Sequence, residues 1–341
     1  MTLTTALLLL GGVVLLAVVV QGVWAARRAK PRRADVALPM AAKDRVEPAL
    51  GAEAATPPPV LRPAPLRRVA RIDALIDAIA PLTLEAPVSG EFVISHLPPS
   101  RRAGTKPFYI EGLDTDSGEW EPPAAGRRYG ELQAGVQLAG RSGALNEIEY
   151  SEFVQKVQAF AEGVGAMADF PDMLEVVARA RELDGLASPL DAQLTVTLRS
   201  NAVAWSVGYI QQCAARQGFV PGAVPGRLVL PGPDETAPPA LVLGFDAQAA
   251  LADDAQKAAV RECTLILDVP QTEARHEPFP LWHRTATALA EDMDATPVDD
   301  EGQPVTLHAF AAIGRELDQL YGQLEALDLG AGTPAARRLF S

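Results

Sequence analysis

The chain has 341 residues, of which 48% are hydrophobic, and its formal net charge is −13 at pH 7. This length leaves room for one or two domains of ordinary size, and the hydrophobic fraction is that of a folded protein. An acidic protein repels phosphate backbones, so the charge argues against a nucleic-acid partner.

The N-terminal stretch predicts a membrane anchor. Residues 1–26 carry no charged side chain, and residues 6–24 form an apolar run. About 20 apolar residues are enough for a helix to cross a hydrocarbon core about 30 Å thick. A cleaved signal peptide carries its positive charges ahead of a shorter apolar core, whereas here the basic residues of 27–33 follow the run. Positive charge tends to stay in the cytoplasm, so we expect a periplasmic N-terminus, a single-pass anchor in the lipid bilayer and a cytoplasmic remainder.

Residues 27–68 predict a disordered linker. They are rich in proline and mixed charge and show neither the period of a strand nor that of a helix. Repeated proline removes backbone donors and stiffens a chain towards polyproline II. A domain that follows such a spacer is held away from the bilayer.

From residue 69 the sequence becomes a mixed α and β pattern. Segment 72–84 could be a strand or a short helix. Alternation and helical spacing then predict a series of elements along the first half. The expected strands are 108–113 and 131–138, and the expected helices are 149–164 and a second one that starts at 170–172 and runs through Leu183.

The second half repeats this order of elements. Leu194, Val196 and Leu198 alternate with polar residues, which is typical of a strand buried on one face. Gly218 predicts the end of a helix. The expected strands are 193–198, 227–230, 240–245, 263–269 and 295–298, and the expected helices are 207–217, 281–293 and 307–327.

An internal repeat is visible when the two halves are overlaid. Residues 159–162 (AFAE) fall on 288–291 (ALAE), and residues 181–184 (RELD) recur unchanged at 315–318. Self-similarity of this kind predicts duplicated domains. The alternative is one large α+β domain whose helices have recurrent composition.

Three parts of the chain together resemble the ZipA family of bacterial cell-division proteins. The head is similar to that family's anchor, although Val23 stands where the family usually has Phe, and the proline-rich spacer follows in the expected place. The rest of the likeness is an ordered set of short motifs between about residues 190 and 327. These motifs are 210–212 (IQQ), 217–219 (QGF), 239–241 (PAL), 264–270 (TLILDVP) and 298–300 (VDD).

This resemblance implies a non-enzymatic adaptor at midcell. In that family an antiparallel sheet carries three helices on one face, and its other face takes the C-terminal peptide of the tubulin-like division protein FtsZ. The anchor thereby tethers the division ring to the inner membrane. The corresponding domains here are an anchor 1–26, a linker 27–68, a first diverged α+β repeat 69–188, a ZipA-like domain 189–329 and a flexible tail 330–341.

Strand alternation then indicates which residues line the open sheet face. Residues that neighbour the inward Leu and Val side chains point outward, and several are apolar or small. Such a face is a shallow groove for apolar anchors of a peptide. Scattered apolar residues are ordinary on an exposed surface, however, and the first half could instead pack over this face and bury it. The candidate contact residues are Thr195, Thr197, Val224, Val229, Val242, Gly244, Thr264 and Ile266.

No pattern of catalytic residues accompanies this site. The four histidines lack metal-ligand spacing, and GxSxG, phosphate-loop and dinucleotide motifs are missing from the sequence. We therefore expect no cofactor, no metal and no small-molecule substrate. Arg101, Arg102, Arg127 and Arg128 read as solvated loop charges, and Cys213 and Cys263 as buried free thiols. The alternative function is a membrane-bound scaffold or enzyme with a site between the two halves.

Overall fold

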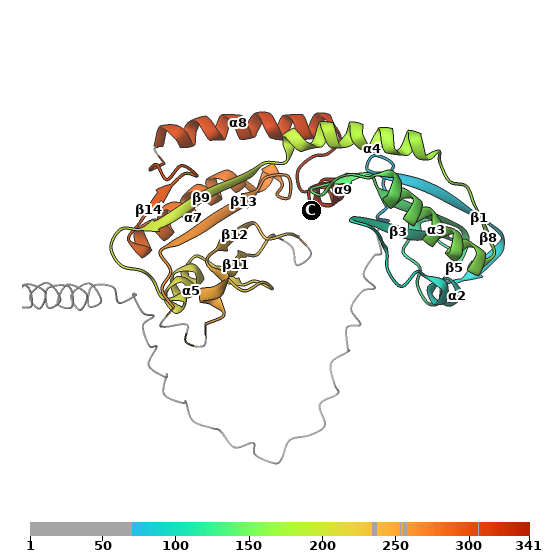
Figure 1. Ribbon diagram of the computed structural model, residues 1–341, viewed down its shortest axis with the longest axis horizontal. Coiled ribbons are helices and arrows are strands. Elements are labelled where there is room, and N and C mark those ends of the chain that lie inside the picture. The colour runs from blue at the N-terminus through green and yellow to red at the C-terminus, as the bar shows by residue number, and fades with distance from the viewer. Residues whose placement is uncertain (1–69, 234–236, 253, 255–257, 306) are drawn as a thin grey trace, which may run out of the picture. The chain divides into compact units, whose positions relative to one another are not determined.

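The computed structural model has the expected α+β class and contains two compact domains (Figure 1). The first domain is discontinuous: it consists of residues 70–190 together with Pro334–Ser341. The second domain consists of Asp191–Thr333. The predicted anchor 1–26 and linker 27–68 lie outside the residues described. Within those residues, no helix is both long and apolar enough to cross a bilayer. The structure describes residues 70–233, 237–252, 254, 258–305 and 307–341.

The first domain is built on an antiparallel sheet with strand order β2-β3-β5-β1-β8, with β4 paired to β3. A separate hairpin, β6-β7, precedes the helix α3. The strands are β1 (Asp77–Ser89), β2 (Arg102–Ala103), β3 (Lys106–Asp114), β4 (Trp120–Glu121), β5 (Arg128–Gln137), β6 (Ala139–Gly140), β7 (Gly143–Ala144) and β8 (Ala166–Ala168).

The helices of the first domain are set by local signals at their ends. Asn146 forms a capping box with Glu149 at the start of α3, and Gly165 ends this helix in the left-handed conformation. Phe153 of α3 packs edge-on against Phe108 of β3, 5.5 Å between ring centroids, so α3 covers one face of the sheet. The helices are α2 (Gly90–His96), α3 (Glu147–Val164), α4 (Met173–Ala187) and α9 (Pro334–Leu339), with a 3-10 turn at Ser188–Leu190.

The second domain has a six-stranded antiparallel sheet with order β10-β11-β12-β13-β9-β14. The strands are β9 (Gln193–Ser200), β10 (Val220–Pro221), β11 (Arg227–Leu230), β12 (Leu241–Gly244), β13 (Glu262–Asp268) and β14 (Ala295–Val298). The helices are α5 (Val207–Arg216), α6 (Ala247–Ala250), α7 (Pro278–Met293) and α8 (Leu307–Ala326), with a 3-10 turn at Ala274–His276.

The core of the second domain lies between one sheet face and three helices. Val196, Leu198 and Leu265 point inward, as their alternation predicted, and are at most 1% exposed. They pack with Ile210 of α5, Trp282 of α7 and further residues of α8. Burial of this apolar surface is the main stabilising contribution to such a layer. The helices therefore cover one face of the sheet, and side chains of the other face, such as Val242 and Ile266, are partly exposed.

The two domains share a common order of their central elements along the chain and across the sheet, although β4 and the β6-β7 hairpin occur in the first domain and β10 in the second. In the first domain, β1 pairs on one side with the long strand β5 and on the other with the short strand β8, which follows α3. In the second domain, β9 pairs in the same way with β13 and with the short strand β14, which follows α7. The registers of these pairs also agree. Ala166, the first residue of β8, pairs with Leu84, the eighth residue of β1, and Ala295, the first residue of β14, pairs with Ser200, the eighth residue of β9.

Counting from these anchor pairs matches individual positions of the two sheets. Gly135 of β5 takes the position of Ile266 in β13, and Tyr109 of β3 takes that of Val242 in β12. The topology that the repeated motifs suggested is therefore present in both halves.

The segment expected to be a flexible tail is folded. Residues 334–339 form α9, and Ala336, Leu339 and Phe340 are at most 2% exposed. The expectation failed because the contacts of this segment are made to residues more than 200 positions away, which no local pattern reveals. Strand β1 likewise starts at Asp77 rather than near Ile72, and α2 was not predicted.

Lowering the pH is expected to destabilise the first domain through Glu149. Its carboxylate accepts hydrogen bonds from the backbone N–H and hydroxyl of Thr105 at 2.8 and 2.7 Å. Burial acts to raise the pKa of Glu149, but hydrogen bonds from Thr105 and Asn146 outweigh it and lower the pKa below its ordinary value. The carboxylate thus stabilises the fold above that ordinary value, and the contribution is lost as the pH falls through the folded pKa.

Glu149→Gln should therefore lower the free energy of unfolding at pH 7 by about 1–3 kcal/mol. Urea denaturation between pH 7 and pH 3 would measure it, and the variant should lose less stability over this range than the parent. Identical pH profiles for the two proteins would contradict the assignment.

Candidate functional site

The predicted contact residues lie on the face of the second sheet that the helices leave uncovered. Val229, Val242, Ile266 and Thr195 stand opposite one another on β11, β12, β13 and β9, so they form a row across four strands. All four are partly exposed. Side chains that face each other in this way lie within about 5 Å, so the row presents a continuous, mainly aliphatic strip.

A second row of small residues runs beside this strip. Gly244, Thr264 and Thr197 pair across β12, β13 and β9, and the hydroxyl oxygens of the two threonines are 3.4 Å apart. Thr195, at the end of the first row, lies with its hydroxyl 3.4 Å from a carboxylate oxygen of Asp300. The loop after β14 therefore borders the face on this side.

An open hollow of about 770 Å³ lies on the same face. Four of the eight predicted residues line it, namely Val224, Gly244, Thr264 and Ile266. The other predicted residues continue the face beyond the hollow. Val224 precedes β11 and is 53% exposed, so an apolar side chain stands at the rim.

Two glycines give the hollow its shape. Gly226 has φ +77°, and a Cβ there would come within 2.6 Å of the carbonyl oxygen of Phe245, so this turn requires glycine. The turn is closed by a hydrogen bond of 2.8 Å from the Phe245 amide to the Gly226 carbonyl. At Gly244 the nearest atom to an added Cβ is 3.9 Å away, so the missing side chain leaves open space.

Charged side chains border the hollow and were not predicted. Glu262 accepts a hydrogen bond from Arg199 at 2.7 Å, and Asp246 caps α6. Arg227 and Arg261 are exposed, and neither forms an ion pair with any residue that the structure describes. Two such guanidinium groups favour a carboxylate in the bound partner, with an attraction that salt screens. Neither arginine could be placed from periodicity, because one begins a short strand and the other precedes one.

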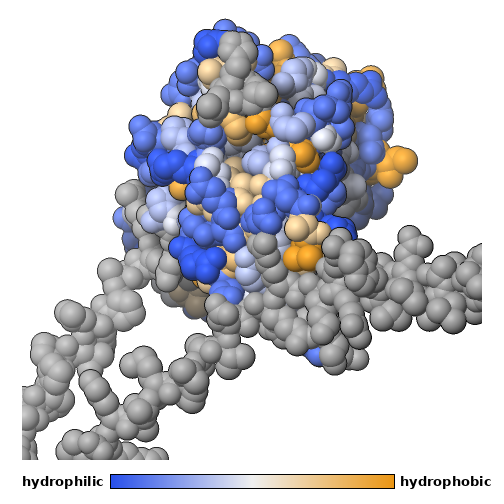
Figure 2. Space-filling model, turned by 90° about the vertical axis from the view of Figure 1, so that its left-hand side faces the viewer, coloured by the Kyte–Doolittle hydropathy of each residue, from blue (hydrophilic) through white to orange (hydrophobic). Residues whose placement is uncertain are grey.

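The surface of the second domain that faces the viewer in Figure 2 is mainly hydrophilic. Hydrophobic residues appear there singly or in small groups among polar ones. On the open sheet face, the aliphatic strip is bordered by the charged residues Asp300, Glu262, Arg227 and Arg261. An aliphatic strip with a polar border is the surface expected of a transient peptide interface rather than of a permanent one.

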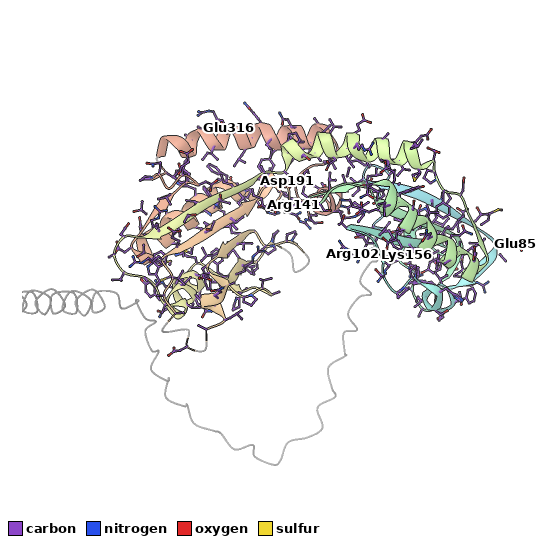
Figure 3. The ribbon with its side chains drawn as sticks, in the orientation of Figure 1. Glu85, Arg102, Arg141, Lys156, Asp191 and Glu316 are labelled. Carbon is purple, nitrogen blue, oxygen red and sulfur yellow. The ribbon has the colours of Figure 1, made fainter. Side chains whose placement is uncertain are left out.

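A second hollow, of about 680 Å³, lies in the first domain and is basic. Lys106 at its wall is 1% exposed, and its ammonium donates to the Ser142 hydroxyl at 2.8 Å and to the Gly143 carbonyl. Lys156 of α3 lies beside Arg102 of β2 and donates to its carbonyl at 2.7 Å (Figure 3). Because the buried ammonium already has acceptors, this hollow makes a weaker case for a ligand than the open sheet face.

Both cysteines are buried free thiols, as predicted. Burial raises the pKa of Cys263 to about 12, and the neighbouring Cys213 acts in the same direction. A thiol with so high a pKa forms little thiolate at neutral pH and is chemically inert in the folded state.

Comparison with known proteins adds no family. No protein-family model and no curated protein match the chain significantly. Among solved structures, one titled "Structure of FgChi7B" is similar with 10% sequence identity and a TM-score of 0.20. The match covers 75% of this chain and 55% of that one, so the chain spans about half the length of that protein. A likeness this slight carries no argument about fold or function.

Proposed function

We propose that this chain is a membrane-anchored cell-division adaptor of the ZipA type. It binds the C-terminal peptide of FtsZ through the outer face of the second sheet and tethers the division ring to the cytoplasmic face of the inner membrane. The proposal starts from the resemblance of the anchor, spacer and strand motifs to that family. The observation that carries it furthest is the open hollow on the helix-free face, lined by Ile266, Gly244 and Thr264.

The chemistry of this face indicates the kind of peptide that it takes. The strip from Val229 to Ile266 offers apolar contact, the space over Gly244 admits a side chain, and Arg227 and Arg261 attract a carboxylate. A peptide with one or two apolar anchors and an acidic residue matches this pattern. Affinity for one peptide need not be high, because a filament offers many tails and a membrane concentrates the adaptor.

We further infer that the two domains are copies of one ancestral domain. Their shared strand order and register support this inference, together with the repeated motif at 181–184 and 315–318. Duplicated domains commonly diverge in function, because one copy can keep the original site while the other changes. The second domain, which carries the ZipA-like motifs, is the copy to which we assign FtsZ binding.

Ile266→Asp is expected to weaken binding of the FtsZ C-terminal peptide at least about tenfold while leaving the domain folded. The side chain is partly exposed in the middle of the strip, so the charge enters the contact and not the core. Burying an unpaired carboxylate against an apolar anchor costs well over the 1.4 kcal/mol that a factor of ten requires. Fluorescence anisotropy with a labelled peptide would measure the dissociation constant.

The matched control is Leu251→Asp, the same kind of change at a residue of this domain that is 70% exposed and lies outside the hollow. It should bind like the parent. Equal binding by the parent and Ile266→Asp would reject this face as the site, and absence of binding by the parent would reject the function.

A further inference from the structure

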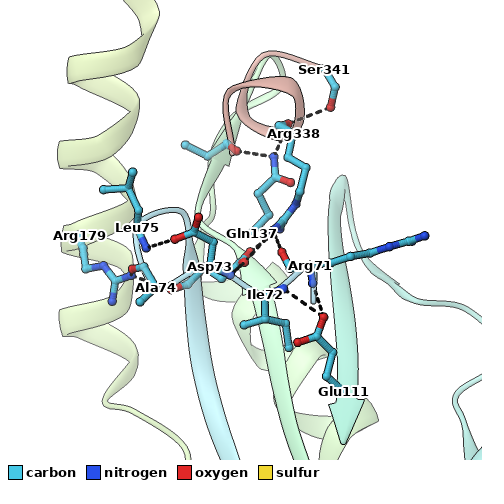
Figure 4. Close-up of polar contacts among 12 residues, drawn as sticks. Arg71, Ile72, Asp73, Ala74, Leu75, Glu111, Gln137, Arg179, Arg338 and Ser341 are labelled. Atoms are coloured by element: carbon cyan, nitrogen blue, oxygen red, sulfur yellow. Dashed lines mark hydrogen bonds and ion pairs between the residues drawn. The ribbon is translucent and has the colours of Figure 1, made fainter. Parts of the chain in front are cut away.

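Part of the chain covers the outer face of the first sheet. Two segments contact it, residues 70–75 and residues 334–341 (Figure 4). We call residues 334–341 the return segment. The backbone amides of Arg71 and Ile72 donate to the carboxylate of Glu111, which is 1% exposed on β3. This face is therefore occupied by the protein itself.

The occupied place corresponds to the open site of the second sheet. A Cβ on Gly135 would lie 2.8 Å from Cγ2 of Ile72, so the Ile72 side chain fills the space above this glycine. The matching position in the second sheet is Ile266, which brings its own side chain and lies under the hollow. One copy of the fold thus shows a chain segment seated where the other copy is empty.

Arg338 is the main polar contact of the return segment. Its guanidinium donates in a fork to both carboxylate oxygens of Asp77, at 2.8 and 2.5 Å, and lies 4.7 Å from the ring centroid of Tyr109. Gln137 donates to the Arg338 carbonyl at 3.0 Å. Asp77 is fully buried beneath these contacts. A fork-shaped ion pair combined with an aromatic ring distinguishes arginine from lysine, because only the guanidinium has this planar geometry.

Apolar side chains complete the contact. Leu339 and Phe340 are each 2% exposed, directly after the arginine. The segment therefore places one arginine and two large apolar residues in consecutive positions. Anchors of this kind, within a few residues, are typical of short peptide ligands.

The core of the first domain lies on the other side of the sheet. Phe108 packs with Phe153 of α3 on the helix-covered face, whereas Asp77 and Tyr109 belong to the opposite face. The layer between sheet and helices does not include Arg338. Release of the return segment would consequently uncover Asp77, Tyr109 and Gln137, the residues of the outer face that Arg338 contacts.

We propose that Asp77, Tyr109 and Gln137 form an arginine-reading peptide site, and that the return segment is its exchangeable ligand, supplied by the chain itself. Tethering raises the local concentration of the segment, so the site stays closed to other peptides. A peptide with an arginine followed by two large apolar residues is the partner that fits. This inference does not depend on FtsZ binding, which we assign to the other domain.

The test uses the full chain with a specific protease recognition sequence inserted between Thr333 and Pro334. After cleavage, a fluorescein-labelled peptide with the sequence of residues 334–341 should bind saturably, as measured by anisotropy. The uncut protein should bind it at least about tenfold more weakly, because the tethered segment competes. In the peptide, Arg338→Ala should reduce affinity at least about tenfold and Arg338→Lys by less, whereas Pro334→Ala, at an exposed position, should bind normally.

Three results would overturn the proposal. The cut protein could lose its far-ultraviolet circular dichroism, or it could keep the cut segment through gel filtration without exchange over a day. In both cases the segment is a permanent part of the fold. Equal affinity of the parent and Arg338→Ala peptides would show that the site does not read arginine.

Discussion

Arg338→Ala in the intact chain is expected to weaken docking of the return segment by about 3–5 kcal/mol, enough to release it. The substitution removes one partner of a buried ion pair and leaves the carboxylate of Asp77 without its fork of donors, which is among the costliest changes in a folded protein. Once the return segment has left the sheet, the carboxylate of Asp77 regains contact with water, so the substitution lowers the stability of the rest of the domain little further. Release should therefore be local.

Hydrogen exchange measures this release directly. Amides of residues 335–341 should lose their protection in Arg338→Ala, while amides of α3 keep theirs. The matched control is Arg181→Ala, which breaks an exposed ion pair of 2.9 Å with Glu147 in the same domain. Such a pair contributes at most about 1 kcal/mol, so protection should hardly change. Unaltered protection of the return segment in Arg338→Ala would contradict the role of the Asp77 pair.

Trp282→Ala is expected to destabilise the second domain by about 3–5 kcal/mol. Trp282 is 1% exposed in α7, stacks on Phe279 at 6.0 Å and meets Phe310 edge-on at 5.7 Å between ring centroids. Its indole N–H also donates to the carbonyl of Leu265 at 3.3 Å, and Leu265 lies between Thr264 and Ile266, two of the β13 residues that line the hollow. Removing the ring leaves a cavity under β13 and takes away the hydrogen bond from the indole to Leu265.

The two buried cysteines provide the measurement, because both belong to the second domain. Labelling of Cys213 and Cys263 by a thiol reagent requires opening of that domain, so the labelling rate should rise by a factor of at least about 100 for a loss of 3 kcal/mol. Trp120→Ala makes the same substitution in the first domain, at a partly buried residue of β4. It should leave the labelling rate near that of the parent, and an equal rise in both variants would show that the effect is not specific to the core of the second domain.

Local patterns were sufficient to predict most of the second sheet and its two faces. The alternation of Leu194, Val196 and Leu198 predicted which side of β9 is buried, and burial confirms it. This works because side chains of a strand alternate strictly, so a few apolar residues determine the direction of all their neighbours. The repeated motifs likewise indicated a common order of elements, which both sheets have.

Contacts between distant segments could not be predicted in the same way. Arg338 and Asp77 are 261 positions apart, and nothing in either neighbourhood indicates the other. The short apolar pattern of 334–341 resembled a frayed end, because one turn of helix has no stability of its own without a surface to pack on.

The sequence by itself thus determined the α+β class, the register of faces in the second sheet and the burial of the two cysteines as free thiols. Only the tertiary structure decided that the last residues complete the first domain, that Ile72 fills the space above Gly135, and that Arg227 and Arg261 border the hollow. Periodicity is a property of neighbouring residues and can be read along the chain. A surface site depends on which distant segments fold together, and that is set by the packing of the whole domain.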